Sequence, residues 1–434
     1  MKVGLVSLGC AKNLVDSEAI LALMKNNNFD IVQDEKEADI IIVNTCGFIE
    51  SSKQESINTI LEMASYNKLL IVTGCLVQRY KEELEKELPE VDLFVPIKDY
   101  YRLGELIESA LKKKNQKIIG EFTFDNRVLA TPFYTAYLKI SEGCNNCCTY
   151  CAIPLIRGKF VSYPLEKLVA QAKDLANRGV KELVVISQDT TRYGSDFINQ
   201  NVTTVTLLKE LLKIKEFSYI RLLYLYPDEL TDELIELIGK EERLTPYFDL
   251  PIQHSSTKLL EAMHRRGDRE FLLELIKRIR TKVPHAIIRT TLIVGFPGET
   301  EEDILDLKEF IKEVRFDHLG CFTYSPEDGT PSSSYPNQID EEVKQRRYEE
   351  IMELQAQISL ELNEKRVGQI FKGIILDYDV ENNVYSMRSA FNAPDDIDGN
   401  IFVKSNKPLA EGEEVKVVIE DYDTYNLYAS LIDE

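Results

Sequence analysis

Four of the eight cysteines of the chain lie within eight consecutive positions, in the segment GCNNCCTYC, residues 143–151. Thiolates at such close spacing bind metals, and two interpretations compete. Two CxxC pairs, Cys144/Cys147 and Cys148/Cys151, indicate a tetrahedral zinc site. A C-x3-C-x2-C pattern of Cys144, Cys148 and Cys151 indicates an iron–sulfur cluster. Zinc sites usually separate their two CxxC turns by about a dozen residues or more, whereas Cys147 and Cys148 are adjacent. We therefore favour the iron–sulfur cluster and keep zinc as the alternative.

Three further cysteines each follow an apolar run that predicts a β-strand, and each has a glycine beside it. They are Cys10 in VSLGC, Cys46 in VNTC and Cys75 in VTGC. Ligands of open parallel sheets bind beyond the carboxyl ends of the strands, so three thiols at equivalent strand ends are expected to converge. A single free cysteine is more often a small buried apolar residue, and we keep that interpretation for Cys321, in the middle of LGCFTYS.

Three thiolates on a cluster of four irons leave one iron open, and that iron can chelate the amino and carboxylate groups of a cofactor. Other strand ends carry polar groups and glycines that would lie at the same rim. The candidate cofactor contacts are Tyr150 in the cysteine loop, Gln188 and Asp189 after ELVVIS, and Gly295 and Glu299 in GFPGE. For Tyr150, ordinary packing is the alternative.

The composition is that of an acidic globular protein. Its 434 residues include 52 Lys and Arg against 73 Asp and Glu, a formal net charge of −21, which repels phosphate backbones and favours a neutral or basic partner. No signal peptide and no apolar run long enough for a membrane span is recognisable. We expect a cytoplasmic protein that makes no use of a membrane, and in that reducing compartment clustered cysteines favour metal binding over disulfides.

The apolar runs divide the chain into three parts. Residues 1–115 alternate predicted strands and helices, which predicts an α/β domain with a parallel sheet. Residues 116–132 interrupt the pattern and predict a linker. Residues 133–362 carry six more predicted strands, YLKIS, ELVVIS, IRLLYLY, FDLPIQ, AIIRTTLIVG and HLGCFTY, with helices between them; this favours a partial TIM-type βα barrel. Residues 366–434 are rich in β-formers and turn residues and predict a small β-barrel.

The cysteine loop, with an aromatic residue before its last cysteine, resembles the radical S-adenosylmethionine superfamily. The upstream cysteines and the terminal β-domain resemble the methylthiotransferases over essentially the full length, with a cluster domain, a radical barrel and a TRAM domain. Several motifs resemble the branch that modifies an aspartate of small-subunit ribosomal protein twelve. The sister branches that modify adenosine in transfer RNA usually have QSGS at residues 253–256 and an RPGT-like run at 326–330, where this chain has QHSS and PEDGT. The motifs are SLGCAKNLVDSE, NTCGFIESSKQES, GCLVQRY, ISEGCNNCCTYCAIP, QDTTRYG, PIQHSS, RTTLIVGFPGETEED and YSPEDGT.

The resemblance implies two 4Fe-4S clusters and S-adenosyl-L-methionine as cofactors. One cluster, on Cys144, Cys148 and Cys151, would bind S-adenosylmethionine and split it to a deoxyadenosyl radical that takes a hydrogen from the β-carbon of the aspartate. The other, on Cys10, Cys46 and Cys75, would hold or deliver the sulfur, and a second S-adenosylmethionine would supply the methyl group. A cellular one-electron reductant and a sulfur donor are implied as partners. The resemblance names no catalytic residue beyond these ligands, and Cys147 departs from the basic or polar residue frequent at its position.

The terminal domain tests the choice of substrate. From Arg366 on it has six Lys and Arg against fourteen Asp and Glu, a net charge of −8, whereas RNA-binding domains rely on basic contacts to phosphate. The acidic surface is either simply solvated or steers a basic ribosomal protein, and Arg388 is a candidate lone contact within it. Methylthiolation of transfer RNA is the less favoured alternative. A zinc- or cluster-bearing RNA-binding or regulatory module without catalysis is a further one.

Overall fold

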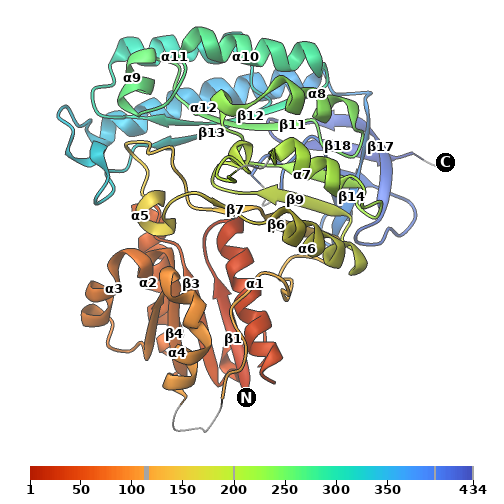
Figure 1. Ribbon diagram of the computed structural model, residues 1–434. Helices are drawn as coiled ribbons and strands as arrows, with labels where there is room; N and C mark the ends of the chain where they lie inside the picture. The colour runs from red at the N-terminus through yellow and green to blue at the C-terminus, as the bar shows by residue number, and fades with distance from the viewer. Residues whose placement is uncertain (112–116, 199–200, 395–396, 433–434) are drawn as a thin grey trace.

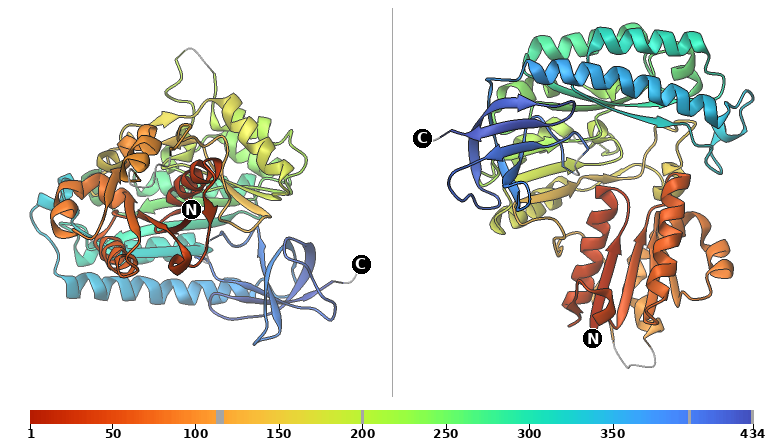
Figure 2. Two further views of the ribbon diagram at one scale, coloured as in Figure 1. Left: turned by 90° about the horizontal axis from the view of Figure 1, so that it is seen from below. Right: turned by 180° about the vertical axis from the view of Figure 1, so that it is seen from behind.

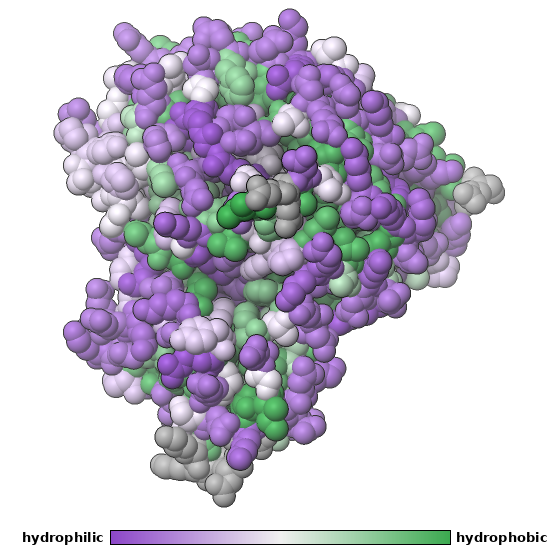
Figure 3. All heavy atoms as spheres, in the orientation of Figure 1, coloured by the Kyte–Doolittle hydropathy of each residue, from purple (hydrophilic) through white to green (hydrophobic). Residues whose placement is uncertain are grey.

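The computed structural model describes residues 1–434 except 112–116, 199–200, 395–396 and 433–434. Figure 1 shows three parts: an N-terminal α/β domain below, a strand-and-helix barrel above it, and a small β-barrel beside the upper part. The views from below and from behind in Figure 2 show the long helix α12 (Glu341–Glu364) running along the barrel toward the small β-barrel. The surface seen in Figure 3 is mainly hydrophilic, with apolar side chains in smaller patches.

A parallel sheet of five described strands, in the order β2-β1-β3-β4-β5, forms the N-terminal domain. The central strand β3 is buried along its whole length because apolar clusters cover both faces of the sheet. One cluster joins the sheet to α1 and α4, and the other joins it to α2 and α3. The bounds are β1 (Lys2–Ser7), α1 (Ala11–Asn26), β2 (Asp30–Ile31), β3 (Ile40–Thr45), α2 (Glu50–Ala64), β4 (Leu69–Gly74), α3 (Cys75–Glu87), β5 (Leu93–Pro96) and α4 (Leu103–Ala110), with 3₁₀ turns at Glu35–Glu37 and Ile97–Arg102.

The predicted linker follows helix α1 instead of crossing open solvent. The predicted boundary at residues 115 and 116 falls outside the described residues, and from Lys117 to Pro132 the segment contains no helix or strand. Glu18 of α1 holds it at two points: its backbone oxygen accepts from Val128 N at 3.1 Å, and its carboxylate pairs with Arg127 at 2.8 Å. Both side chains of that ion pair are almost fully buried, so the linker is part of the interface between α1 and the barrel.

Parallel strands form the central barrel in two described sheets of three, β10-β9-β6 and β11-β12-β13. A parallel bridge between Ile220 and Leu244 lies between them. Helices pack outside the strands around one large apolar core. The bounds are β6 (Thr135–Lys139), β7 (Ser141–Glu142), α5 (Ile153–Arg157), β8 (Val161–Ser162), α6 (Leu165–Asn177), β9 (Glu182–Ile186), α7 (Thr204–Leu211), β10 (Tyr219–Leu222), α8 (Asp232–Lys240), β11 (Tyr247–Gln253), α9 (Thr257–Ala262), α10 (Arg269–Lys282), β12 (Ile287–Val294), α11 (Glu301–Val314) and β13 (His318–Thr323), with 3₁₀ turns at Thr190–Arg192, Pro227–Glu229 and Pro331–Ser334.

The C-terminal strands close into a barrel in the order β14-β15-β16-β18-β17. Alternate residues of its strands point into a small apolar core. Two of its arginines point inward to the central barrel: Arg388 pairs with Glu182 at 2.7 Å, and Arg366 pairs with Asp317. The suggestion that Arg388 lies as a lone contact on an acidic face was therefore wrong. The bounds are β14 (Ile370–Asp379), β15 (Val384–Ser389), β16 (Ile401–Lys404), β17 (Glu414–Tyr422) and β18 (Leu427–Leu431).

The fold class predicted from the sequence is confirmed: a parallel-sheet α/β domain, a partial βα barrel and a small β-barrel follow one another along the chain. All six strands expected in the central part are present there. No helix in the part of the chain that the structure describes has both the length and the apolar character needed to cross a membrane.

Candidate active site

The three N-terminal cysteines follow three adjacent strands of one sheet. Cys10 caps α1 just after β1, Cys46 follows β3 directly, and Cys75 is the first residue of α3 after β4. Since β1, β3 and β4 are neighbours with parallel pairing, these thiols share the carboxyl edge of the sheet. They also interact electrostatically with one another. The expected convergence is thus present, which is what three strand-end ligands of one group require.

Glycines make this convergence sterically possible. A Cβ atom on Gly9 would lie 2.8 Å from Cys46 Cβ, and one on Gly74 would lie 2.4 Å from Thr45 O. Gly9 and Gly74 also have positive φ angles, which glycine adopts at little cost. Burial raises the pKa of the Cys75 thiol to about 11, and it also raises that of Cys46. These thiols therefore stay protonated at neutral pH until a cationic group binds them, as metal ligands do.

The second set of cysteines lies on one loop after β6 and β7. Gly143 starts this loop with φ +73°, and a Cβ there would lie 2.2 Å from Lys159 O, so only glycine lets the two segments touch. Inside the loop, Cys151 N donates to Cys148 O at 3.0 Å and Asn146 N donates to Cys144 Sγ at 3.5 Å. The loop thus turns back on itself and keeps Cys144, Cys148 and Cys151 within electrostatic reach of one another.

The surroundings of the loop are aromatic and cationic. Cys148 Sγ lies 3.1 Å from Tyr226 Oη, and the Arg265 guanidinium stacks 3.9 Å over the Tyr226 ring. Burial raises the pKa of Cys144 to about 11 and that of Cys151 further. No group of three or more His, Cys, Asp or Glu among the described residues is arranged to hold a single metal ion.

Cys147 differs from its three neighbours in the loop. It is exposed and has φ +54°, and its backbone oxygen lies 3.1 Å from His264 Nδ1. A left-handed conformation is unfavourable for a residue with a side chain. We therefore expect Cys147→Gly to keep the full iron content and to be as stable as the wild type or up to about 1 kcal/mol more stable. Iron and sulfide analysis with thermal unfolding measures both, and loss of iron would show that Cys147 is a ligand.

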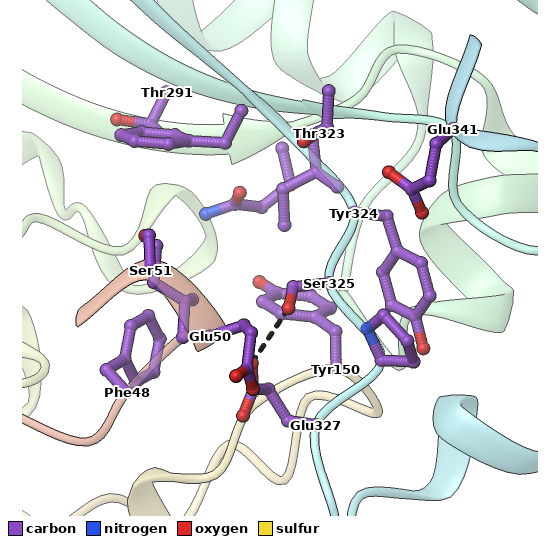
Figure 4. Close-up of a pocket in the computed structure, with 15 residues that line it drawn as sticks. Phe48, Glu50, Ser51, Tyr150, Thr291, Thr323, Tyr324, Ser325, Glu327 and Glu341 are labelled. Carbon is purple, nitrogen blue, oxygen red and sulfur yellow. Dashed lines mark hydrogen bonds between the residues drawn. The ribbon is translucent and has the colours of Figure 1, made fainter. Parts of the chain in front are cut away.

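A cavity of about 660 Å³ lies where the segment after Cys46, the cysteine loop and the barrel strands β12 and β13 meet. Phe48, two residues after Cys46, lines it from the N-terminal domain, and Tyr150 lines it from the cysteine loop. Figure 4 shows Phe48, Glu50 and Ser51 on one side of the cavity, Thr291 and Thr323 on strands of the barrel, and Glu327 near Tyr150. The remaining lining residues are Ile49, Gln253, Ile293, Phe322, Tyr324, Ser325, Pro326 and Glu341.

The other residues expected to contact a cofactor lie in two different places, one beside the cysteine loop and one inside the barrel. Asp189 accepts from Asn146 Nδ2 of the cysteine loop at 2.8 Å, and Gln188 Nε2 donates to Glu142 at 2.9 Å. Both therefore border the loop, at the end of β9. Glu299 is buried, and its Oε1 accepts from Gly295 N at 2.8 Å and from Arg347 at 2.8 Å. The Gly295 and Glu299 contacts are internal to the barrel, and their part in cofactor binding stays a prediction.

Models of known families match all three parts of the chain. Residues 2–96 match "Uncharacterized protein family UPF0004", residues 138–311 match the radical SAM superfamily, and residues 367–432 match the TRAM domain. Proteins named ribosomal protein uS12 methylthiotransferase RimO match over the whole length. The protein from Clostridioides difficile is 46% identical over 100% of this chain and 99% of its own. That from Alkaliphilus oremlandii is 47% identical over 100% of both chains. This chain belongs to the ribosomal protein uS12 methylthiotransferase family.

Solved structures agree with the fold of this methylthiotransferase. The radical S-adenosylmethionine methyltransferase TsrM from Kitasatospora setae, solved with cobalamin and a [4Fe-4S] cluster bound, covers 76% of each chain with a TM-score of 0.54 and 14% sequence identity. The cobalamin-dependent S-adenosylmethionine radical enzyme OxsB gives a TM-score of 0.52 at 13% identity, over 88% of this chain and 63% of its own. At such identities the similarity concerns the fold alone.

A buried ion pair joins the two sides of the cavity in the methylthiotransferase. Arg79 of α3 donates to Glu327 at 2.9 Å and to Gly47 O, next to Cys46, at 2.8 Å. Lys53 of α2 also reaches Glu327, at 3.1 Å. Glu327 belongs to the loop after β13, where the transfer RNA branches usually have an RPGT-like run. The pair therefore links the Cys46 loop to the barrel at a position that differs between the branches.

We expect Arg79→Ala to loosen this contact by about 2–4 kcal/mol, because removal of one cation leaves the buried Glu327 carboxylate with Lys53 and the Ser325 hydroxyl as partners. Amide hydrogen exchange should then be faster in residues 46–51 and 325–330. Lys81→Ala on the same helix is the matched control, since its pair with Glu85 is exposed and is worth about 0.5 kcal/mol or less. Equal exchange in both variants would contradict the prediction.

Sequence reasoning missed the charged residues between the two cysteine sets. Arg157 and Lys139 of the barrel are nearly fully buried, and each pairs with the buried Asp16 of α1 across the domain interface. One signal was available: Arg157 is the only charged residue of the otherwise apolar run CAIPLIRG that follows the last loop cysteine. Arg157 lies six positions after Cys151, and a buried arginine needs an anionic partner. That partner, Asp16, lies on another domain, and nothing in the sequence around Arg157 indicates it.

Proposed function

We propose that this protein transfers a methylthio group to the β-carbon of an aspartate of ribosomal protein uS12 by radical S-adenosylmethionine chemistry. The observation that carries the proposal is a cavity lined both by Phe48, two residues after Cys46, and by Tyr150 of the cysteine loop, in a chain that matches uS12 methylthiotransferases over its full length. A substrate side chain in that cavity would have the Cys46 loop on one side and the Cys144–Cys151 loop on the other. This arrangement suits a reaction in which one site removes a hydrogen atom and the other provides sulfur.

The residues present fit the cofactors that the family uses. Cys144, Cys148 and Cys151 would hold the cluster that binds S-adenosylmethionine, and Cys10, Cys46 and Cys75 would hold the second. When bound, the two 4Fe-4S clusters and S-adenosylmethionine supply the radical, the sulfur and the methyl group. The protein supplies enclosure: Tyr150 and Phe48 wall the cavity with aromatic surface and limit the access of water. A one-electron reductant and a sulfur donor complete the proposed set of partners.

Charge supports a basic polypeptide as the substrate over transfer RNA. Three carboxylates, of Glu50, Glu327 and Glu341, line the cavity, but each pairs with a cation, so the charge argument depends on the TRAM domain and the overall charge of −21. The TRAM domain is acidic, and Arg366 and Arg388 make ion pairs to the barrel instead of facing solvent. These features suit a basic ribosomal protein that associates under electrostatic attraction. The proposed place of action is the cytoplasm.

The test is mass spectrometry of uS12 and of total transfer RNA from a host that lacks its own methylthiotransferases and expresses this chain. A methylthio mass gain confined to one aspartate of uS12 is expected. A gain on transfer RNA adenosine would leave the chemistry standing and overturn the substrate. No gain on either would favour a non-catalytic module, and intact S-adenosylmethionine after reduction of the purified protein would establish it.

A further inference from the structure

A buried ionic cluster lies where the N-terminal domain meets the barrel. Asp16 of α1 accepts from Lys139 of β6 at 2.6 Å and from Arg157 of α5 at 2.5 Å. Glu142 accepts from the same two cations, at 2.8 Å and 3.3 Å. The side chains of Asp16, Lys139 and Arg157 are at most 2% exposed. Two cations thus balance two anions, and solvent reaches this cluster at the side chain of Glu142, which is 21% exposed.

One end of this cluster touches a proposed cluster ligand. Arg157 Nη2 lies 3.4 Å from Cys75 Sγ and donates to Asn13 Oδ1 at 2.7 Å. Cys75 also packs with Ala152 and Ile156 in one apolar cluster. Ala152 directly follows Cys151, so the short helix α5 leads from the last cysteine of the loop to the thiol of the other set.

We propose that Arg157 is a positioning residue which sets the reduction potential of the cluster on Cys10, Cys46 and Cys75, and that it does so only while the two domains are docked. The inference rests on the proposed function, since it takes those cysteines as ligands. Hydrogen bonds and charges at the sulfur ligands are among the main determinants of an iron–sulfur potential. A guanidinium at a ligand sulfur stabilises the more negative, reduced state and therefore raises the potential.

The charge balance around Arg157 strengthens this effect. Without Arg157, the anions Asp16 and Glu142 would face Lys139 alone, which leaves one uncompensated negative charge beside the cluster. Because the site is buried, solvent screens that charge weakly. The guanidinium belongs to the barrel and the ligand to the N-terminal domain, so separation of the domains would remove the cation and lower the potential. The potential of the N-terminal cluster would thereby depend on the docking of the barrel.

The experiment uses the full-length chain with Cys144, Cys148 and Cys151 replaced by alanine, so that only the N-terminal cluster forms. Redox titration followed by electron paramagnetic resonance gives its midpoint potential with and without Arg157→Gln. We expect the potential of Arg157→Gln to be more negative and that of Arg157→Lys to lie between it and the parent, because lysine keeps the charge but not the forked geometry. Iron content should be equal in all three.

Arg127→Gln is the matched control, because it also removes a buried arginine that contacts α1, at Glu18, and Arg127 donates its hydrogen bonds to Glu18 and to Tyr137 O instead of to a cysteine. Its potential should equal that of the parent. An unchanged potential in Arg157→Gln with full iron, or an equal shift in Arg127→Gln, would overturn the role of Arg157 alone. Absence of a cluster in the parent would instead overturn the N-terminal site, and the inference with it.

Discussion

Replacement of Cys148 by alanine should reduce the reductive cleavage of S-adenosylmethionine to background while the N-terminal cluster remains. Cys148 is the buried member of the loop set, beside Tyr226 and Arg265, so no exposed neighbour can take its place. Loss of one cluster of two equal ones should lower the iron content by about half. Deoxyadenosine formation under dithionite, with iron analysis, measures both effects.

Cys147 is adjacent in sequence to Cys148 and makes a useful comparison. Its side chain is exposed and its φ angle is positive, so Cys147→Gly should retain cleavage. If cleavage survived in the Cys148→Ala variant with undiminished iron, the assignment of the radical site to this loop would be wrong.

Replacement of Cys46 by alanine should stop sulfur transfer but leave the cleavage of S-adenosylmethionine intact. Cys46 belongs to the N-terminal set and precedes Phe48, which lines the cavity, but it lies on a different domain from the loop. We therefore expect deoxyadenosine formation to continue and methylthiolated uS12 to fall below detection. Chromatography of deoxyadenosine and mass spectrometry of uS12 from the same reaction separate the two activities.

Cys321→Ala is the control, because it removes a thiol that belongs to neither cysteine set. Cys321 is buried in β13 within the barrel core, and its substitution should cost only the stability expected of a small core truncation, about 1 kcal/mol. Both activities should survive. Methylthiolated product from the Cys46→Ala protein would refute the assignment of sulfur transfer to the N-terminal cysteines and of S-adenosylmethionine cleavage to the loop cysteines.

The elements of the site could be predicted because each depends on local sequence. Cys10, Cys46 and Cys75 follow apolar runs, and parallel strands bring their ends to one edge by geometry alone. The barrel strands are short apolar runs rich in β-branched and aromatic residues with helical segments between them, a pattern that predicts parallel strands. For these features, the secondary structure that the local sequence favours is the one that the folded domain contains.

The contacts between domains could not be predicted. The partnership of Arg157 with Cys75, of Arg79 with Glu327 and of Arg388 with Glu182 depends on how separate folding units dock, and no periodicity encodes that docking. Arg388 illustrates the error that results. The acidic composition of the domain made Arg388 a candidate lone contact on an acidic face, whereas in the structure it pairs with Glu182 and holds the TRAM domain to the barrel.

The two cysteine sets also differ in the stage of folding at which their thiols can come together. The loop set lies on one short segment, so a chain that has folded little can already present it. The N-terminal thiols become neighbours only after two parallel crossovers have placed β1, β3 and β4 side by side, which is a slow, non-local step in folding. Iron bound there adds its binding free energy to the stability of the native domain. If these thiols hold iron as proposed, the N-terminal sheet must be complete before its metal can be loaded.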